Sequence, residues 1–501
     1  MPVRTTGGDE GFPSRLQQSE RTFSSALPSP DLMRTLRRLA VLHLALASAL
    51  SAQGRAPEPT RPIDWAAIER EGATLMRDYL RVNTTNPPGN ELAAARFLRD
   101  FLAKEGIEAQ ILDTATLAPG RANLYARVKG NGSKKAIALV QHMDVVPATP
   151  SSWSVPPFSG ELRDGFIYGR GALDMKGLAI AQLMALQLLV ADGHRLQHDI
   201  LFLSVPDEEV GGTLGAAWLA QQRPDLLDAA AVWDEGGIGM TDVLPAPALF
   251  ISVTEKQVLW VRIVAEGPAG HGSRPFAGAA PRRLVEALNR IINSPPAPRL
   301  TPIARSVFRS VGGDVGGLEG FAMRNMKNPV VWLFADGLLE KEPWSAAMTR
   351  DTVALTMLDG GYKPNVIPER ASATLDCRLL PDTKVDAFLA QLRDTIDDPE
   401  VKIEVIQAPD TAAPSPTKNP LFEAMQRAAA RVYPGVVVTE SMMTGGTDSR
   451  FFRRRGVPAY GFFPVLISKE LAASVHGVDE RIPVQDLGKA VQVIYEALKT
   501  L

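Results

Sequence analysis

Three consecutive acids, Asp207, Glu208 and Glu209, follow an apolar run and precede two glycines in the segment "SVPDEEVGGT". Like charges on adjacent side chains repel one another, so the arrangement suits either a solvated turn or a site that binds a strong cation. The solvated turn is the simpler explanation. Whether it holds depends on whether the rest of the chain supplies further ligands for a cation.

Histidines and acids recur just beyond strand-like apolar runs in other parts of the chain. They are His142 in "QHMDVVP", Asp174 in "GRGALDMKG", Asp234 and Glu235 in "AAAVWDEGG", and His476 in "SVHGVDE". The carboxyl ends of strands line the ligand crevice of an open α/β sheet. Because several of these groups fall at such ends, we expect them to converge on one site.

The ligand types favour zinc, which accepts imidazole nitrogen and carboxylate oxygen where no thiolate is offered. Two Zn²⁺ ions would be balanced by Asp174, Glu209, one acid of the Asp234/Glu235 pair and a bridging hydroxide. Glu208 is then left over. Since adjacent residues leaving a strand point in different directions, Glu208 can face the attacking water as a general base. We therefore expect two zinc ions per subunit, at a site that Co²⁺ or Mn²⁺ could also occupy.

Alternating helix-like and strand-like runs predict the elements that position these side chains. From about residue 64 the alternation indicates an α/β sheet covered by helices on both faces. Apolar residues at helical spacing predict helices over 65–82, 91–106 and 177–193. Residues 122–142 have the pattern of two strands around Gly130-Asn131-Gly132, which is a hairpin signal, and 199–205 that of a buried strand.

The pattern changes after about residue 254, where half-exposed strands flank a helix. Residues 294–347 form a long segment rich in Pro and Gly, expected to be irregular. The predicted fold class is α/β: a discontinuous catalytic domain with a mixed, mostly parallel sheet, plus an inserted smaller α+β domain with a lid. The predicted domains are a leader at 1–63, a first catalytic part at 64–253, the inserted domain at 254–378 and a second catalytic part at 379–501.

The N-terminal residues predict export. Basic Arg34, Arg37 and Arg38 precede about a dozen apolar residues, then small residues and a Pro-rich linker. This is the layout of a signal peptide near 33–52, with Met33 as the initiator. We expect a periplasmic or secreted protein without a stable membrane span after cleavage. An uncleaved signal anchor is the alternative.

Composition excludes some partners and cross-links. The chain has 501 residues, which predicts two or three domains, and 45% of them are apolar. Its 54 basic and 56 acidic residues give no electrostatic footprint for nucleic acid. The single cysteine, Cys377, excludes an internal disulfide and is most simply a small core residue.

Seven motifs occur in a familiar order between about residue 65 and the C-terminus. They are "QHMDVVP", "YGRGALDMKG", "SVPDEEVGG", "VWDEGG", "AGHGSRP", "GGTDSR" and "HGVDERIPV". The chain resembles the dizinc aminoacylase/carboxypeptidase family of metallopeptidases, which includes glutamate carboxypeptidase, acetylornithine deacetylase and succinyl-diaminopimelate desuccinylase. The resemblance implies hydrolysis of an amide or peptide bond, releasing a C-terminal amino acid from short peptides or N-acyl amino acids.

The resemblance also implies roles for the metal ligands. Asp174 would bridge both ions, with His142 and one acid of "DEGG" on the first and Glu209 and His476 on the second. Asp144 would orient His142. Family members use either acid at the "DEGG" turn; the choice stays open, with a slight preference for Asp234 over Glu235.

Further residues would act on the substrate. The inserted domain would form a homodimer, and His271 would reach the partner subunit's site to hold the oxyanion. Asn365, Arg378 and the turn beginning at Gly445 and Gly446 would bind the free carboxylate of the substrate.

Two other functions remain open. One is a cocatalytic-zinc aminopeptidase, whose clan often lacks an inserted dimerisation domain. The other is a non-catalytic binding protein on the same scaffold, which is disfavoured because the Glu208 base and a full ligand set are both present. The sequence does not display which substrate side chain is preferred.

Overall fold

A computed structural model describes residues 62–501 except 115–117, 195, 340–341 and 411. The chain divides into a unit of residues 1–62 and a unit of residues 63–501, and only the second is described below. The predicted signal peptide lies outside the described residues. Within the part of the chain described, none of the helices combines the length and apolar character needed to cross a bilayer.

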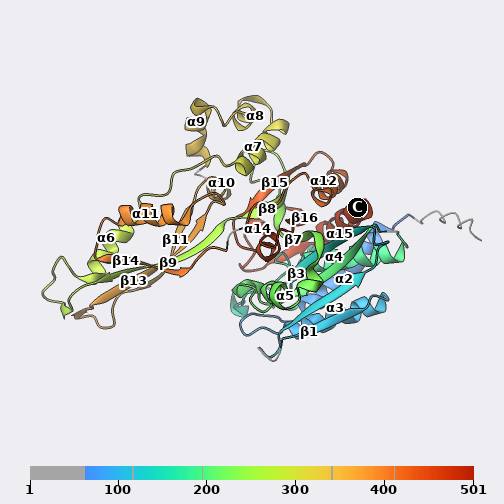
Figure 1. The fold of residues 1–501 in the computed structure, drawn as a ribbon, viewed down its shortest axis with the longest axis horizontal. Helices are drawn as coiled ribbons and strands as arrows, with labels where there is room; N and C mark the ends of the chain where they lie inside the picture. The colour runs from blue at the N-terminus through green and yellow to red at the C-terminus, as the bar shows by residue number, and fades with distance from the viewer. Residues whose placement is uncertain (1–61, 115–117, 195, 340–341, 411) are drawn as a thin grey trace, which may run out of the picture. The chain divides into compact units, whose positions relative to one another are not determined.

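Eight strands form the large sheet of this unit, in the order β1-β2-β6-β3-β7-β16-β8-β15 (Figure 1). β6, β3, β7 and β16 run parallel to one another, whereas β1 and β2 pair antiparallel at one edge. The sheet is therefore mixed and mostly parallel, as expected. The strands are β1 Ala109–Asp113, β2 Ala122–Val128, β3 Lys134–His142, β6 His198–Val205, β7 Ala229–Met240, β8 Ala248–Glu255, β15 Val437–Met443 and β16 Ala459–Ile467.

Helices cover both faces of the large sheet because its strands are apolar on both sides. On one face the core contains α2 Trp65–Leu80, α3 Glu91–Lys104, α4 Lys176–Ala191, α12 Pro420–Val432 and α15 Val484–Lys499. On the other face α5 Ala216–Gln222 and α13 Ser449–Arg453 pack against the strands. The predicted helices over 65–82, 91–106 and 177–193 correspond to α2, α3 and α4.

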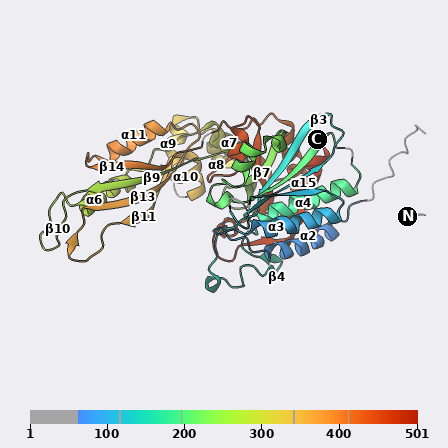
Figure 2. The ribbon, with the colours of Figure 1, turned by 60° about the horizontal axis from the view of Figure 1, so that its bottom comes forward.

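A second sheet of four antiparallel strands has the order β11-β13-β9-β14. Its strands are β9 Gln257–Glu266, β11 Thr352–Asp359, β13 Arg370–Leu379 and β14 Val401–Gln407. Every second residue of β13 is buried, among them Cys377, and these side chains pack against α6 Ala280–Ile292 and α11 Val385–Ile396. Figure 2 shows both helices beside the strands of this sheet. Because β14 pairs with β9, the small sheet and its helices extend beyond the expected boundary at 378.

Residues 294–347, expected to be irregular, are largely helical. The segment contains α7 Pro302–Asp314, α8 Gly317–Arg324, α9 Pro329–Leu339 and the start of α10 Pro343–Thr349. Three of these helices start on proline, which is suited to a first helical turn. The prolines of this segment therefore mark the starts of helices and not an irregular loop. Buried residues of α7 share a core with Phe250 of β8 and Met442 of β15.

The expected hairpin over 122–142 is also wrong. β2 and β3 do not pair with each other, because β6 lies between them and pairs with both. All eight residues of β6 are buried. A strand this apolar is stable only in the interior of the sheet, and a local turn signal cannot reveal that insertion.

The remaining elements are short. They are β4 Glu161–Arg163, β5 Phe166–Tyr168 and β17 Arg481–Pro483 in a three-stranded sheet, the pair β10 Gly270–His271 and β12 Val366–Ile367, the helix α14 Lys469–Ala472, and the 3-10 turns Pro150–Ser152, Glu208–Val210 and Pro224–Leu227.

Gly461 in β16 is required where this strand passes β7. A Cβ at position 461 would lie 2.0 Å from the carbonyl oxygen of Glu235. We expect Gly461→Ala to lower the free energy of unfolding by about 1–3 kcal/mol, because backbone cannot move aside as a flexible side chain can. Chemical denaturation measures the change.

Gly313→Ala is the matched control, because no described atom lies within 4 Å of the added Cβ, and the helix α7 favours alanine. Equal stability of Gly461→Ala and the parent protein would contradict the close approach of β7 and β16.

Candidate dinuclear metal site

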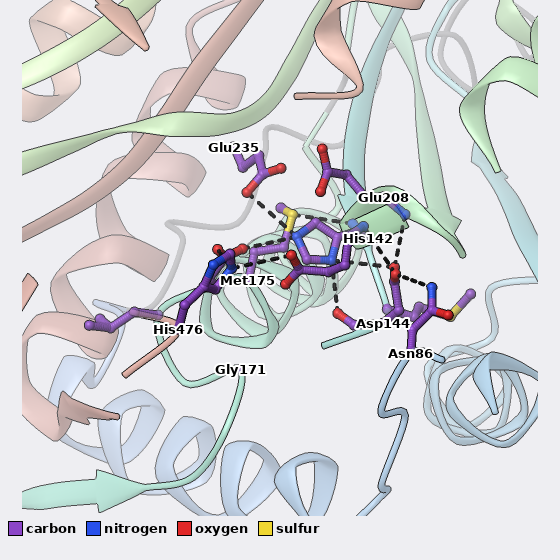
Figure 3. A network of polar contacts seen from close by, with 12 residues as sticks. Asn86, His142, Asp144, Gly171, Met175, Glu208, Glu235 and His476 are labelled. Carbon is purple, nitrogen blue, oxygen red and sulfur yellow. Dashed lines mark hydrogen bonds and ion pairs between the residues drawn. The ribbon is translucent and has the colours of Figure 1, made fainter. Parts of the chain in front are cut away.

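The predicted ligands come from five separate segments that meet where the central strands β3 and β6 end. Figure 3 shows three of these ligands, His142, Glu235 and His476, close to one another. His142 ends β3, Glu209 lies in the turn after β6, and Glu235 lies in β7. Asp174 directly precedes the helical turn that starts α4, and His476 follows α14. β3 pairs with both β6 and β7, so the sheet order itself brings the first three ligands together.

Two groups of donor atoms share Asp174. The first consists of His142, Asp174 and Glu235, and the second of Asp174, Glu209 and His476; within each group the ligand atoms lie within 4.8 Å of one another. Asp174 Oδ1 lies 3.0 Å from His142 Nε2, and Asp174 Oδ2 lies 3.1 Å from His476 Nε2. His476 Nε2 also lies 3.2 Å from Glu209 Oε2. Nitrogen and carboxylate donors converging on two points fit two divalent ions held on either side of Asp174.

A backbone contact fixes the orientation of the His142 ring. Its Nδ1 lies 2.9 Å from the backbone carbonyl oxygen of Asp144 and donates a hydrogen bond to it. The lone pair of Nε2 is then the one that can bind a metal ion. The Asp144 carboxylate has a different task. It accepts hydrogen bonds from the backbone N–H groups of Glu208 and Glu209, at 3.1 and 3.2 Å, and from Asn86 Nδ2 at 2.8 Å. Asp144 thus orients His142 and also fixes the turn that carries the two glutamates.

The three adjacent acids point to three different partners. Asp207 forms an ion pair with the buried Arg121, at 2.6 Å. Glu209 faces His476. Glu208 belongs to neither donor group among the described residues, and its nearest charged partner is Arg450, at 3.9 Å. The like charges are therefore separated, and Glu208 is left free to handle protons.

In the "DEGG" turn the structure places Glu235, and not Asp234, with the donor group. Glu235 Oε2 lies 3.5 Å from His142 Nε2. Asp234 is buried and accepts a hydrogen bond from the Ser449 hydroxyl, at 2.8 Å. Successive side chains of a strand point to opposite faces, so only one of the pair can face the site. The slight preference for Asp234 is not supported by this geometry.

Glu480 supports the site without facing it, and sequence reasoning gave it no role. Its buried carboxylate accepts hydrogen bonds from the backbone N–H groups of Gly171, Leu173 and Asp174, at 3.0, 2.8 and 3.1 Å. Arg170 Nη1 neutralises the same carboxylate, at 2.7 Å. Glu480 lies in the motif "HGVDERIPV", four residues after His476. Its place in that motif is the only feature of the sequence that could have indicated a role at the site.

Concentrated negative charge dominates the electrostatics of the site. Hydrogen bonds to Asp174 and Glu209 raise the pKa of His476 to about 10. Burial lowers the pKa of His142, but the charge of Glu235 and its carboxylate contacts outweigh burial and raise it well above its usual value. Burial, followed by the charge of Glu235, raises the pKa of Glu208 well above its ordinary value. A field that favours protons so strongly also favours divalent cations.

A cavity of about 840 Å³, here called the polar cavity, opens at these acids. Three basic residues line it: Lys256, Arg378 and Arg450. Gly445 and Gly446 line it as well. Arg378 is held by Asp376, with N–O distances of 2.7 and 3.0 Å, so its guanidinium is oriented before a ligand arrives.

Two predicted residues do not reach this cavity. His271 is exposed on β10, where its Nδ1 lies 2.8 Å from the Ser273 hydroxyl. The backbone of Asn365 accepts a hydrogen bond from the N–H of Gly272, next to His271. The two residues are therefore neighbours of each other in the small domain, and neither lines the cavity of its own chain.

Comparisons with known proteins agree with this geometry. A family model described as peptidase family M20/M25/M40 matches residues 138–500. The N-fatty-acyl-amino acid synthase/hydrolase PM20D1 of Xenopus tropicalis is 33% identical over 370 residues, which are 72% of this chain and 71% of that protein. Aminoacylase-1 of Homo sapiens is 32% identical over 422 residues, which are 83% of this chain and 91% of that protein.

A solved structure shares the fold. The M20 family metallo-carboxypeptidase Sso-CP2 from Sulfolobus solfataricus superposes with a TM-score of 0.62 at 23% identity, covering 86% of this chain and 98% of that one. The resemblance predicted from the seven motifs is confirmed. The matched length and the identity to these relatives show that the chain belongs to peptidase family M20/M25/M40, as a metallohydrolase with relatives of the aminoacylase and carboxypeptidase type.

Proposed function

We propose that the protein is a zinc-dependent amidohydrolase that releases a free amino acid from N-acyl amino acids or short peptides. One observation carries the proposal: two donor groups share Asp174, while Glu208 lies beside them and belongs to neither. The names of the relatives, an N-fatty-acyl-amino acid hydrolase and an aminoacylase, support the same bond type.

His142, Asp174 and Glu235 would hold one ion, and Asp174, Glu209 and His476 the other. The pair of ions, when bound, would acidify water and polarise the amide carbonyl. Glu208 takes the proton of the attacking water and delivers it to the leaving nitrogen, since its carboxylate is half-buried and makes no closer ion pair than the 3.9 Å contact with Arg450. Asp144 keeps Glu208 in place through the backbone of the turn.

The basic residues of the polar cavity would bind the product end of the substrate. Arg378, held by Asp376, presents a fixed guanidinium to the free carboxylate, and the backbone at Gly445 and Gly446 adds donors. Away from the donor groups and Glu208, the acids that line the polar cavity are paired: Glu255 with Arg453, and Asp410 with Arg454. An aminopeptidase would instead need an unpaired acid there for the amino group of its substrate. We therefore place the free carboxylate of the substrate in the polar cavity.

We further propose a homodimer formed through the small domain, and export of the mature chain. β11 is an edge strand of the small sheet with exposed apolar side chains: 38% of Leu355, 66% of Met357 and 65% of Leu358 are accessible. Exposed edges of this kind favour association. His271, which does not line the cavity of its own chain, would then serve the partner's site.

Glu208→Gln tests the base. It should retain both ions and lower kcat for an N-acyl amino acid by about 10²–10⁴-fold, because general base catalysis contributes that much. Metal analysis and steady-state kinetics measure the two quantities. Glu423→Gln, an exposed position on α12, is the matched control. Normal turnover by Glu208→Gln would refute the base assignment.

Glu235→Gln and Asp234→Asn test which acid binds metal. We expect Glu235→Gln to lose one of the two ions on dialysis against a chelator, whereas Asp234→Asn keeps both because an amide oxygen still accepts the Ser449 hydrogen bond. Metal content per chain distinguishes the two variants. The reverse result would assign the ligand to Asp234.

Mixed dimers test the role of His271. Glu208→Gln and His271→Ala should each be nearly inactive alone. When the two are co-expressed, one site of each mixed dimer combines an intact Glu208 with the partner's intact His271, so activity should return. Met357→Lys on β11 should shift the protein toward monomers in size-exclusion chromatography with light scattering. Absence of recovery from a proven mixed dimer would contradict the shared site.

A further inference from the structure

A second cavity, of about 280 Å³ and here called the apolar cavity, also reaches the metal-binding acids. Its walls come from the large sheet, from α4 and from the helical segment that includes α10. They include Leu178, Ile238, Phe250, Trp344, Met442 and Phe463. The charged residues among its lining side chains are Asp174 and Glu235, both members of the donor groups. Away from the acids, this cavity is suited to hydrocarbon and not to a charged group.

Trp344 completes the wall of the apolar cavity. The indole ring packs on Phe250, with ring centroids 5.0 Å apart and planes tilted by 38°. Trp344 belongs to α10, whose Met348 shares a core with buried residues of α7 and with Met442 of β15. The Pro- and Gly-rich segment therefore supplies one wall of the site as a packed helix.

The polar and apolar cavities meet at the donor groups. Asp174, Glu235, Met443, Thr444 and Val475 line both of them. The basic residues Lys256, Arg378 and Arg450 line only the polar cavity. A substrate whose amide lies at the donor groups thus extends one end into a polar chamber that contains these three basic residues, and the other into an apolar one.

We propose that the apolar cavity binds the acyl chain of the substrate, and that the protein prefers N-acyl amino acids with long hydrocarbon acyl groups to N-acetyl amino acids and to dipeptides. The proposal rests on the proposed function, because the amide must lie at the metal-binding acids. The ammonium group of a dipeptide is attached to the carbon next to the scissile carbonyl, so it would lie beside the two divalent ions. The acids nearest to it, Asp174 and Glu235, would already be neutralised by those ions, which leaves the ammonium group repelled. Transfer of a hydrocarbon chain from water into the apolar cavity lowers the free energy.

The test is a chain-length series of N-acyl derivatives of one amino acid, from acetyl to palmitoyl, with the zinc-loaded protein and below the micelle concentration of each substrate. Each methylene that enters the cavity should raise kcat/KM by about fourfold until the cavity is full, since burying one CH₂ is worth roughly 0.8 kcal/mol. The corresponding dipeptide should be a poorer substrate than the acyl compound of equal length.

Ala472→Phe places a ring in the lining of the apolar cavity. We expect it to move the optimum to shorter acyl chains and to reduce kcat/KM for the longest substrates at least tenfold more than for the acetyl compound. Ala430→Phe, an exposed position on α12, is the matched control and should leave the chain-length profile unchanged. Inhibition of the parent protein by free fatty acids of increasing length gives a second measurement that needs no variant, and it should strengthen with length.

The outcomes separate this inference from the proposed function. If no N-acyl amino acid is hydrolysed by the metal-loaded protein, the proposed function fails. If hydrolysis occurs but kcat/KM is flat or falls with chain length, or if Ala472→Phe affects all lengths equally, the proposed function stands and the acyl-binding role of the apolar cavity is wrong.

Discussion

The structure depends on the cost of gathering carboxylates in one half-buried place. Asp174, Glu208, Glu209 and Glu235 lie within one site, and such a cluster is tolerable only where positive charge balances it. His142 and His476 supply contacts on either side of Asp174, and a pair of divalent ions would supply the rest. The charges that do not face the site are neutralised separately: Asp207 by Arg121 and Glu480 by Arg170.

Rigid backbone keeps this cluster in place. The three strands that carry His142, the glutamate turn and Glu235 are neighbours in the sheet, so their ends cannot separate without breaking the sheet. The loop before α4 has no such support from strand pairing. Glu480 provides it instead, through three backbone hydrogen bonds that end at Asp174. The ligands are thus positioned before any ion binds, which reduces the cost of binding it.

Two chambers that meet at the metal-binding acids give the site a direction. The polar chamber contains Arg378, Arg450 and Lys256, and the apolar chamber is lined by Trp344 packed on Phe250. The difference in their polarity would orient an amphiphilic substrate of the kind proposed, because the reverse orientation would bury a carboxylate among apolar side chains. Of the helices α7 to α10, α10 contributes directly to the apolar chamber, through Trp344.

Local sequence was sufficient for the residue types, the α/β alternation and the spare glutamate. Ligand chemistry and strand periodicity are properties of short segments, so His142, Asp174, Glu209 and His476 could be named as candidate ligands from the chain alone, and the structure brings them into the two donor groups. The insertion of β6 between β2 and β3, the pairing of β14 with the small sheet and the choice of Glu235 over Asp234 depend on which distant segments pair, and in which register. So do the contacts of Glu480 and Trp344. Adjacent strand residues face opposite ways, and only the packing of β7 against β3 and β16 decides which of the two acids faces the metal-binding site.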